Sequence, residues 1–158
     1  MTVRITGRAI VLGDDINTDI LQPSRFFSLS RERRVSGVLG GEAEDALAGS
    51  VVVAGRNFGV GSSRESVIRG IIESGVRAVA AHSISRIFLR NAINHGLPAF
   101  AGLESAAGLK TGDHVCIDCG QARLWCEARG IGYALQPLDP YLAAVLDAGG
   151  LQPFMERH

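Results

Sequence analysis

The middle third of the chain contains three short apolar runs, and a segment with helical periodicity follows each of the first two. Uninterrupted apolar runs of this length are typical of strands that are buried on both faces. Strands that alternate with helices predict parallel βαβ units with right-handed crossovers. We therefore expect strands at 51–54, 76–81 and 97–101, joined by helices at 63–74 and 83–94.

Weaker patterns flank this unit on both sides. Before it we expect a strand at 3–11, a polar loop at 14–22 and a short helix at 42–47. After it we expect a hairpin of strands 115–118 and 122–127, a strand at 133–135 beside the hairpin, and a helix at 140–148. The predicted fold class is α/β, with one domain over residues 1–158, a mixed sheet, central βαβ units and a C-terminal hairpin plus helix.

Composition and charge exclude some classes of protein. The formal net charge is zero, which argues against a general nucleic-acid binder. No run of 18 apolar residues is present, so we expect no membrane-spanning helix. Residues 1–13 lack the apolar core and cleavage site of a signal peptide, so we expect a cytoplasmic protein.

The segment 57–65, with sequence NFGVGSSRE, carries the strongest chemical signal. Its glycines let the backbone approach a ligand closely, and a helix that begins there offers free N–H groups to an anion. Arg64 can grip a carboxylate in two places, and Ser62 or Ser63 can donate to a substrate or react as an alkoxide. The same residues also fit a capping box, in which Ser62 and Glu65 only close the helix end.

Two further groups of polar residues have both structural and functional interpretations. Cys116, Cys119 and Cys126 could be ligands of a zinc site, but we favour small buried or turn thiols because a fourth ligand is missing. Arg86, Arg90 and Asn94 recur every four residues and share one helix face, which either faces solvent or meets a partner. On the opposite face we expect Ile84, Ile87, Phe88 and Ile93 to point toward the core, and we interpret His82 and His95 as surface or core histidines.

NFGVGSSRE and the later RIFLRNAINHGLP are similar to motifs of the small subunits of 3-isopropylmalate dehydratase, which correspond to the swivelling domain of the aconitase superfamily. The similarity runs from GDDINTDI at 13–20 to LDAGGL at 146–151, in order. The resemblance implies a swivelling β/β/α domain with a mixed sheet. It also implies the small subunit of a hydro-lyase that isomerises 2-isopropylmalate to 3-isopropylmalate by dehydration and rehydration, in leucine biosynthesis.

The resemblance further implies a cofactor, a partner and a substrate class. A 4Fe–4S cluster, acting on the substrate hydroxyl and one carboxylate, is expected on the large subunit and not on this chain, which should hold no metal. The implied partners are that cluster-bearing large subunit, in a hetero-oligomer, and a small carboxylate substrate, with no nucleic acid and no membrane. The chain alone should be inactive.

Roles of individual residues also follow from the resemblance alone. Ser62 would abstract the carbon-bound proton, and Arg64 would bind a substrate carboxylate and stabilise the alkoxide. Arg25 opens the segment that corresponds to a substrate-recognition loop. The implied substrate-binding residues are Ser63, Arg25, Thr18 and Asp19.

The chain departs from the family pattern at three places. Val60 replaces a common cysteine, Ser66-Val67-Ile68 replace histidine-alanine-proline, and the recognition segment has Phe26-Phe27-Ser28-Leu29. These departures favour, as an alternative, a paralogue that acts on another 2-hydroxy di- or tricarboxylate of the homoaconitate, citraconate or dimethylmalate type. An alternative of another class is a non-catalytic anion-binding module that uses segment 59–64.

Overall fold

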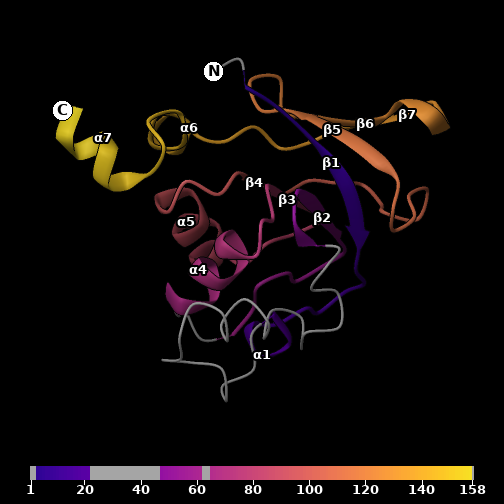
Figure 1. Cartoon of the computed structure of the whole chain (residues 1–158), viewed down its shortest axis with the longest axis horizontal. Coiled ribbons are helices and arrows are strands. Elements are labelled where there is room, and N and C mark those ends of the chain that lie inside the picture. The colour runs from indigo at the N-terminus through magenta and orange to yellow at the C-terminus, as the bar shows by residue number, and fades with distance from the viewer. Residues whose placement is uncertain (1–2, 22–46, 62–64, 158) are drawn as a thin grey trace.

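The computed structural model describes residues 3–21, 47–61 and 65–157, and element labels follow Figure 1. Within these residues, seven strands form one sheet: β1 (Arg4–Val11), β2 (Ser50–Ala54), β3 (Ala78–Ala81), β4 (Ala99–Phe100), β5 (His114–Asp118), β6 (Arg123–Cys126) and β7 (Ile131–Ala134). The helices are α1 (Thr18–Leu21), α4 (Glu65–Glu73), α5 (Arg86–Asn94), α6 (Pro140–Asp147) and α7 (Leu151–Arg157), with a 3-10 turn η3 (Glu127–Arg129).

The sheet is mixed, and its strand order is β4-β3-β2-β1-β5-β6-β7. Strands β1 to β4 are parallel, and we call them, with α4 and α5, the parallel half. Strands β5, β6 and β7 continue the sheet from β1 in antiparallel pairs, and we call them the antiparallel half. The predicted α/β fold, the βαβ units and the C-terminal hairpin with its extra strand are therefore confirmed.

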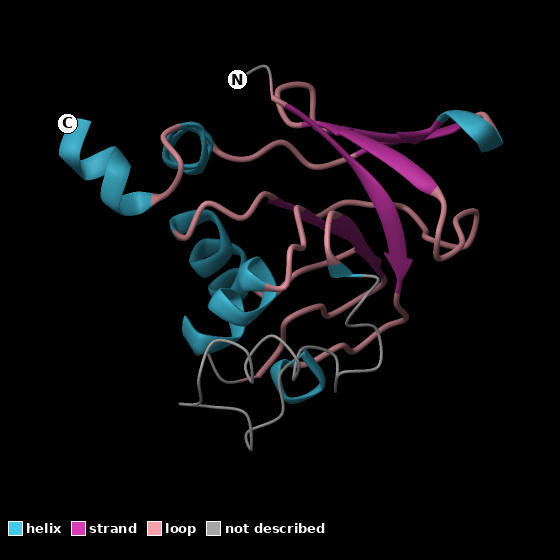
Figure 2. Ribbon diagram, in the orientation of Figure 1, coloured by secondary structure: helices cyan, strands magenta, loops and turns pink. Residues whose placement is uncertain are grey.

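Strand β2 explains why the apolar runs of the sequence are uninterrupted. Val52 and Ala54 face the core that α4 and α5 cover, whereas Val51 and Val53 face the core shared with β5 and β6. All five residues of β2 are buried. Because the sheet curls, the antiparallel half covers the second face of the parallel strands, as Figures 1 and 2 show.

Helices α4, α5 and α6 each bury one apolar stripe and leave the remainder to solvent. On α4 the buried residues are Val67, Ile68, Gly70 and Ile71. The sequence analysis placed Ile87 of α5 toward the core, and this prediction is wrong. Its side chain is 55% exposed. The buried residues of α5 are Phe88, Ala92 and Ile93, and at about 100° per residue Ile87 lies on the opposite side of the helix from the centre of that stripe.

Several local expectations need correction or fall outside the described residues. The segment 14–22 is not loop alone, because Asn17 caps one helical turn, α1, by accepting the N–H of Ile20 at 2.9 Å. A further helix, α7, follows α6 and packs Phe154 against Tyr141. The expected short helix at 42–47 lies outside the described residues except for Leu47. No helix within the described ranges has the length and apolarity needed to cross a membrane.

Candidate functional site

The loops that follow β1 and β2 lie side by side at the carboxyl edge of the parallel strands. The N–H of Gly55 donates to the carbonyl of Gly13 at 3.2 Å. Further along, Gly59 N–H donates to the Ile16 carbonyl at 2.8 Å, and Thr18 N–H donates to the Val60 carbonyl at 3.0 Å. Main-chain bonds in both directions therefore join 13–18 to 55–60, two segments that the sequence marked separately.

The loop after β3 extends this arrangement on the other side. Ser83 accepts the N–H of Asn57 through its hydroxyl at 2.9 Å and the N–H of Phe58 through its carbonyl at 3.0 Å. Ser85 N–H returns a bond to the Phe58 carbonyl at 2.9 Å. The Phe58 ring meets Phe88 edge-on at 5.2 Å between centroids, beneath the loop. Ligands of open α/β sheets gather where such loops meet at the carboxyl ends of strands.

Acidic and amide side chains add further bonds between the first two loops. Asp14 Oδ1 accepts the Arg56 N–H at 2.7 Å, and Asn57 Nδ2 donates to Asp15 Oδ1 at 2.9 Å. These side chains therefore have a structural role, in holding the loops together.

Gly61 shows why segment 57–65 needs glycine. Its φ is +124°, a conformation that side chains disfavour, and a Cβ there would lie 2.6 Å from Thr18 Oγ1. Thr18 is buried and begins α1, and Asp19 is exposed in the first turn of the same helix. The structure thus places Thr18 against the residue that precedes Ser62, whereas Ser62, Ser63, Arg64 and Arg25 lie outside the described residues.

The first described turn of α4 contacts α5 through a histidine that the sequence did not single out as functional. His95 Nε2 lies 2.9 Å from Glu65 Oε1, and Arg69 Nη2 lies 3.2 Å from the same oxygen. The hydrogen bond with His95, and then the Arg69 charge, lower the pKa of Glu65. No periodicity links residues 30 positions apart, so only chain topology could reveal the contact. The Glu65 carboxylate thus already has two side-chain partners, which a capping box with Ser62 would have to share.

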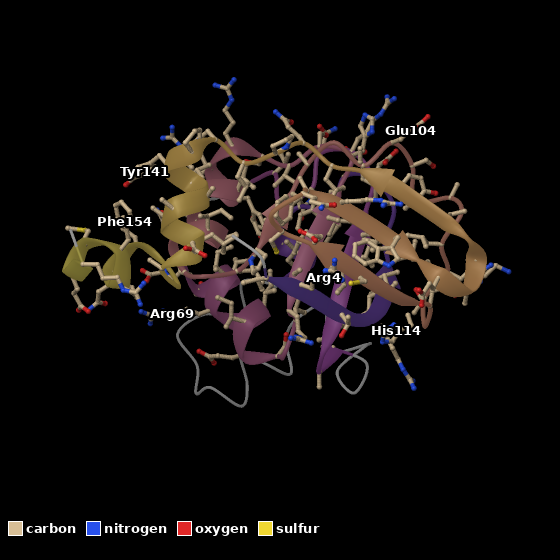
Figure 3. All side chains as sticks on the ribbon, turned by 90° about the horizontal axis from the view of Figure 1, so that it is seen from above. Arg4, Arg69, Glu104, His114, Tyr141 and Phe154 are labelled. Atoms are coloured by element: carbon tan, nitrogen blue, oxygen red, sulfur yellow. The ribbon has the colours of Figure 1, made fainter. Side chains whose placement is uncertain are left out.

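Two hollows lie on opposite parts of the molecule. One, of about 490 Å³, opens beside the paired loops and is lined by Gly13, Arg56, His82 and Glu104 among others. The other, of about 740 Å³, lies on the outer face of the antiparallel half, against Thr6, His114, Cys116 and Trp125. Figure 3 shows His114 at the start of β5 and Arg4 on β1. We place the candidate site at the first, because the ends of β1 and β2 meet there and the glycine-rich turn follows in the same joined loops.

The cysteines lie in the antiparallel half, away from the paired loops. All three are free thiols, and Cys119 and Cys126 are buried. Burial raises the pKa of the Cys119 thiol to about 11, so it is a poor thiolate ligand or nucleophile. Within the described ranges, no group of three or more histidine, cysteine, aspartate or glutamate side chains could hold a metal ion.

The polar stripe of α5 is only partly exposed. Arg86 and Arg90 are exposed, whereas Asn94 is half-buried. Arg90 and Asn94 line a hollow of about 260 Å³ with Asp139 and Tyr141 of the α6 region.

Comparison with known proteins gives a consistent result. The family model of the aconitase C-terminal domain matches residues 43–100. A 3-isopropylmalate dehydratase small subunit from Moorella thermoacetica is 41% identical, over 97% of this chain and 95% of that protein. A methanogen homoaconitase small subunit from Methanothermobacter thermautotrophicus is 38% identical, over 93% of this chain and 88% of that protein.

The solved structures agree with this result. The crystal structure of 3-isopropylmalate dehydratase from Methanocaldococcus jannaschii has a TM-score of 0.89 at 33% identity, covering 98% of this chain and 95% of that one. The curled mixed sheet and its loop edge therefore define an aconitase-type domain. Within that class, the chain belongs to the family of 3-isopropylmalate dehydratase small subunits. The resemblance predicted from the motifs is confirmed.

Proposed function

We propose that this chain is the small subunit of a two-subunit hydro-lyase that isomerises 2-isopropylmalate to 3-isopropylmalate. Residues 1–158 would act as one swivelling domain beside a large subunit. The observation that carries the proposal is the 41% identity to a small subunit of that name over nearly the whole of both chains. The joined loops at the carboxyl edge support it, because they hold the glycine-rich turn next to α1 and α5.

An iron–sulfur cluster is the cofactor that the aconitase family implies, and the described residues of this chain do not fit it. Cluster ligands are cysteine thiolates, whereas two of the three cysteines are buried and the pKa of the Cys119 thiol is raised. We therefore propose that the large subunit holds the 4Fe–4S cluster. This chain would contribute protein groups that bind the substrate and move its proton.

Ser62 and Arg64 are the groups we propose for those tasks. Ser62 Oγ would take the carbon-bound proton of the substrate, and Arg64 would pair with a substrate carboxylate. An alkoxide is costly in water, but a guanidinium and helix N–H groups in a water-excluded site lower that cost. Ser63, Thr18 and Asp19 would donate or position hydrogen bonds to the substrate, and Arg25 would contact its side group.

Exposed apolar side chains around the loop edge support a partner at this face. Ile20 of α1, Val60 before Gly61 and Ile87 of α5 are each more than 40% exposed. Main-chain bonds join their segments, since Thr18 bonds Val60 and Ser85 bonds Phe58. Exposed apolar side chains that gather around a polar site mark interaction surfaces. We propose that the large subunit covers this edge and excludes water from it.

The test is an anaerobic assay of the chain mixed with the cluster-loaded large subunit of its own organism. 3-Isopropylmalate, citraconate and homocitrate are offered separately, and ultraviolet absorbance follows the unsaturated acid. We expect turnover of 3-isopropylmalate with wild-type chain. Ser62→Ala should lower kcat by about 10²–10⁴-fold, the usual contribution of a general base.

Ser66→Ala is the matched control, because Ser66 is a half-buried serine four residues further along the chain. It should retain wild-type activity. Full activity of Ser62→Ala would show that Ser62 is not the base. Carboxylate binding by the chain alone, measured by calorimetry, with no turnover in the mixture would favour the anion-binding module instead.

A second candidate is a paralogous hydro-lyase for a longer substrate. The 38% identity to a methanogen homoaconitase small subunit favours it, and so do the phenylalanines at 26 and 27 in the recognition segment. Turnover of homocitrate without turnover of 3-isopropylmalate would select this candidate.

A further inference from the structure

The His95 ring lies between two hydrogen-bond acceptors. Its Nδ1 is 2.8 Å from the carbonyl oxygen of Asn91, and its Nε2 is 2.9 Å from Glu65 Oε1. A neutral imidazole has one N–H and one bare nitrogen, so it can satisfy only one of these acceptors. With the Glu65 carboxylate ionised, both bonds require the doubly protonated ring.

We propose that His95 is a positioning residue for the proposed reaction. As an imidazolium, it ties the C-terminal end of α5 to Glu65, the residue that directly follows Arg64 in the chain. The tie holds the start of α4 in place relative to the joined loops. This inference rests on the proposed function of Ser62 and Arg64, but the tie itself can be tested without any activity.

His95 has a firm support on α5. The preceding residues Ala92 and Ile93 are fully buried. The next residue, Gly96, packs so closely against the Gly149 carbonyl that a Cβ there would lie 2.5 Å from its oxygen. The ring is also partly shielded, since 28% of its side chain is exposed against 60% for Arg69.

Arg69 cannot replace this tie. Arg69 and Glu65 are four residues apart on α4, so their pair stabilises that helix internally and does not connect it to α5. The pair is also largely exposed, and such pairs contribute little. His95 instead joins the start of α4 to the end of α5, two elements that are 30 residues apart in sequence at this contact.

Two charged groups act on the Glu65 carboxylate within the described part of the chain, and they are His95 and Arg69. The hydrogen bond with His95, and then the Arg69 charge, lower the pKa of Glu65. The carboxylate is therefore ionised at neutral pH and accepts the bond from the His95 ring.

The first test is an unfolding cycle on the full chain by itself. His95→Ala, Glu65→Ala and the double variant are compared with wild type by urea denaturation at neutral pH. Coupled residues give non-additive effects. We expect the shifts in urea midpoint to be non-additive. Additive shifts would overturn the tie.

The second test measures kcat and KM in the two-subunit assay. His95→Ala and Glu65→Ala should each lower kcat/KM by about tenfold near pH 6.5, and the double variant should fall no further, because small misplacements at a site are costly. His95→Gln keeps a side-chain donor for Glu65, so it should retain more of the wild-type kcat/KM than His95→Ala does. His114→Ala, an exposed histidine of the antiparallel half, is the matched control and should keep wild-type activity.

The outcomes separate this inference from the proposed function. Unchanged activity of His95→Ala, or equal losses of activity in His95→Ala and His95→Gln, would overturn the positioning role. An inactive wild-type mixture would instead overturn the proposed function, and the unfolding cycle would then decide on the tie alone.

Discussion

The two halves of the sheet share β1 but differ in what they do with their loops. In the parallel half, every crossover returns the chain to the same end, so the segments after β1, β2 and β3 meet at one edge and bond to one another. In the antiparallel half, consecutive strands turn back at alternate ends. Its loops are therefore divided between two ends, and its polar residues lie on the outer face of the strands.

The outer face of the antiparallel half illustrates that difference. Arg4 and Arg123 each lie within 6 Å of the Trp125 ring, and Arg4 pairs with Asp118 across β1 and β5. These contacts run from strand to strand and stabilise the sheet locally. The parallel connections therefore bring loops together into a site, whereas the antiparallel strands here serve chiefly to cover the core.

The largest effect should come from the core beneath the joined loops. Phe58→Ala should lower the free energy of unfolding by about 3–5 kcal/mol, because a fully buried ring loses its packing on Phe88. Leu124→Ala in the antiparallel half should cost about 2–5 kcal/mol for the same reason. Urea denaturation measures both.

Activity then separates the two halves. Under conditions where both variants remain folded, Phe58→Ala should also lower kcat, since its ring packs on Phe88 beneath the joined loops, whereas Leu124→Ala should keep it. Equal losses of kcat in the two variants would contradict the conclusion that the parallel half forms the site and the antiparallel half only covers the core.

A smaller effect is expected at the glycine that lies against α1. Gly61→Ala places a Cβ against Thr18 at a strained φ, which should cost about 1–3 kcal/mol of stability. Gly13→Ala is the matched control in the neighbouring loop, because its Cβ would meet open space. Thermal unfolding of both chains should show a lower Tm for Gly61→Ala only, and a normal Tm would contradict the close approach.

The smallest effect concerns acid stability in the antiparallel half. The Gln121 N–H, bonded at 2.9 Å, and then the Arg4 pair hold the pKa of Asp118 below its usual range. A lowered pKa in the folded state stabilises the protein above the unfolded pKa, and that contribution is lost as the pH falls through the folded value. Wild type should therefore lose stability in acid, and Asp118→Asn should lose less.

The control for this prediction is Gln121→Ala. It keeps the backbone donor, so its urea midpoint should follow wild type between neutral pH and about pH 3. An Asp118→Asn chain as acid-sensitive as wild type would exclude Asp118 as a source of the effect.

The sequence predicted the strands well because burial on both faces leaves a clear pattern. The runs 51–54 and 76–81 consist of valine and alanine, except for Arg77 in the second run. They form β2 and β3 with small boundary changes. Ile87 was placed wrongly because its hydrophobicity alone predicts burial, whereas the helix phase decides it. The turn α1 was missed because a single capped turn has no periodicity.

By itself, the sequence determined the fold class, the family and the segments that carry the chemistry, because apolar patterning and motif residues are local properties of the chain. Only the tertiary structure decided which segments meet. The bonds of 13–18 with 55–60, and of Glu65 with His95, join residues that are about 40 and 30 positions apart. Such contacts depend on strand order and register, which no local pattern encodes.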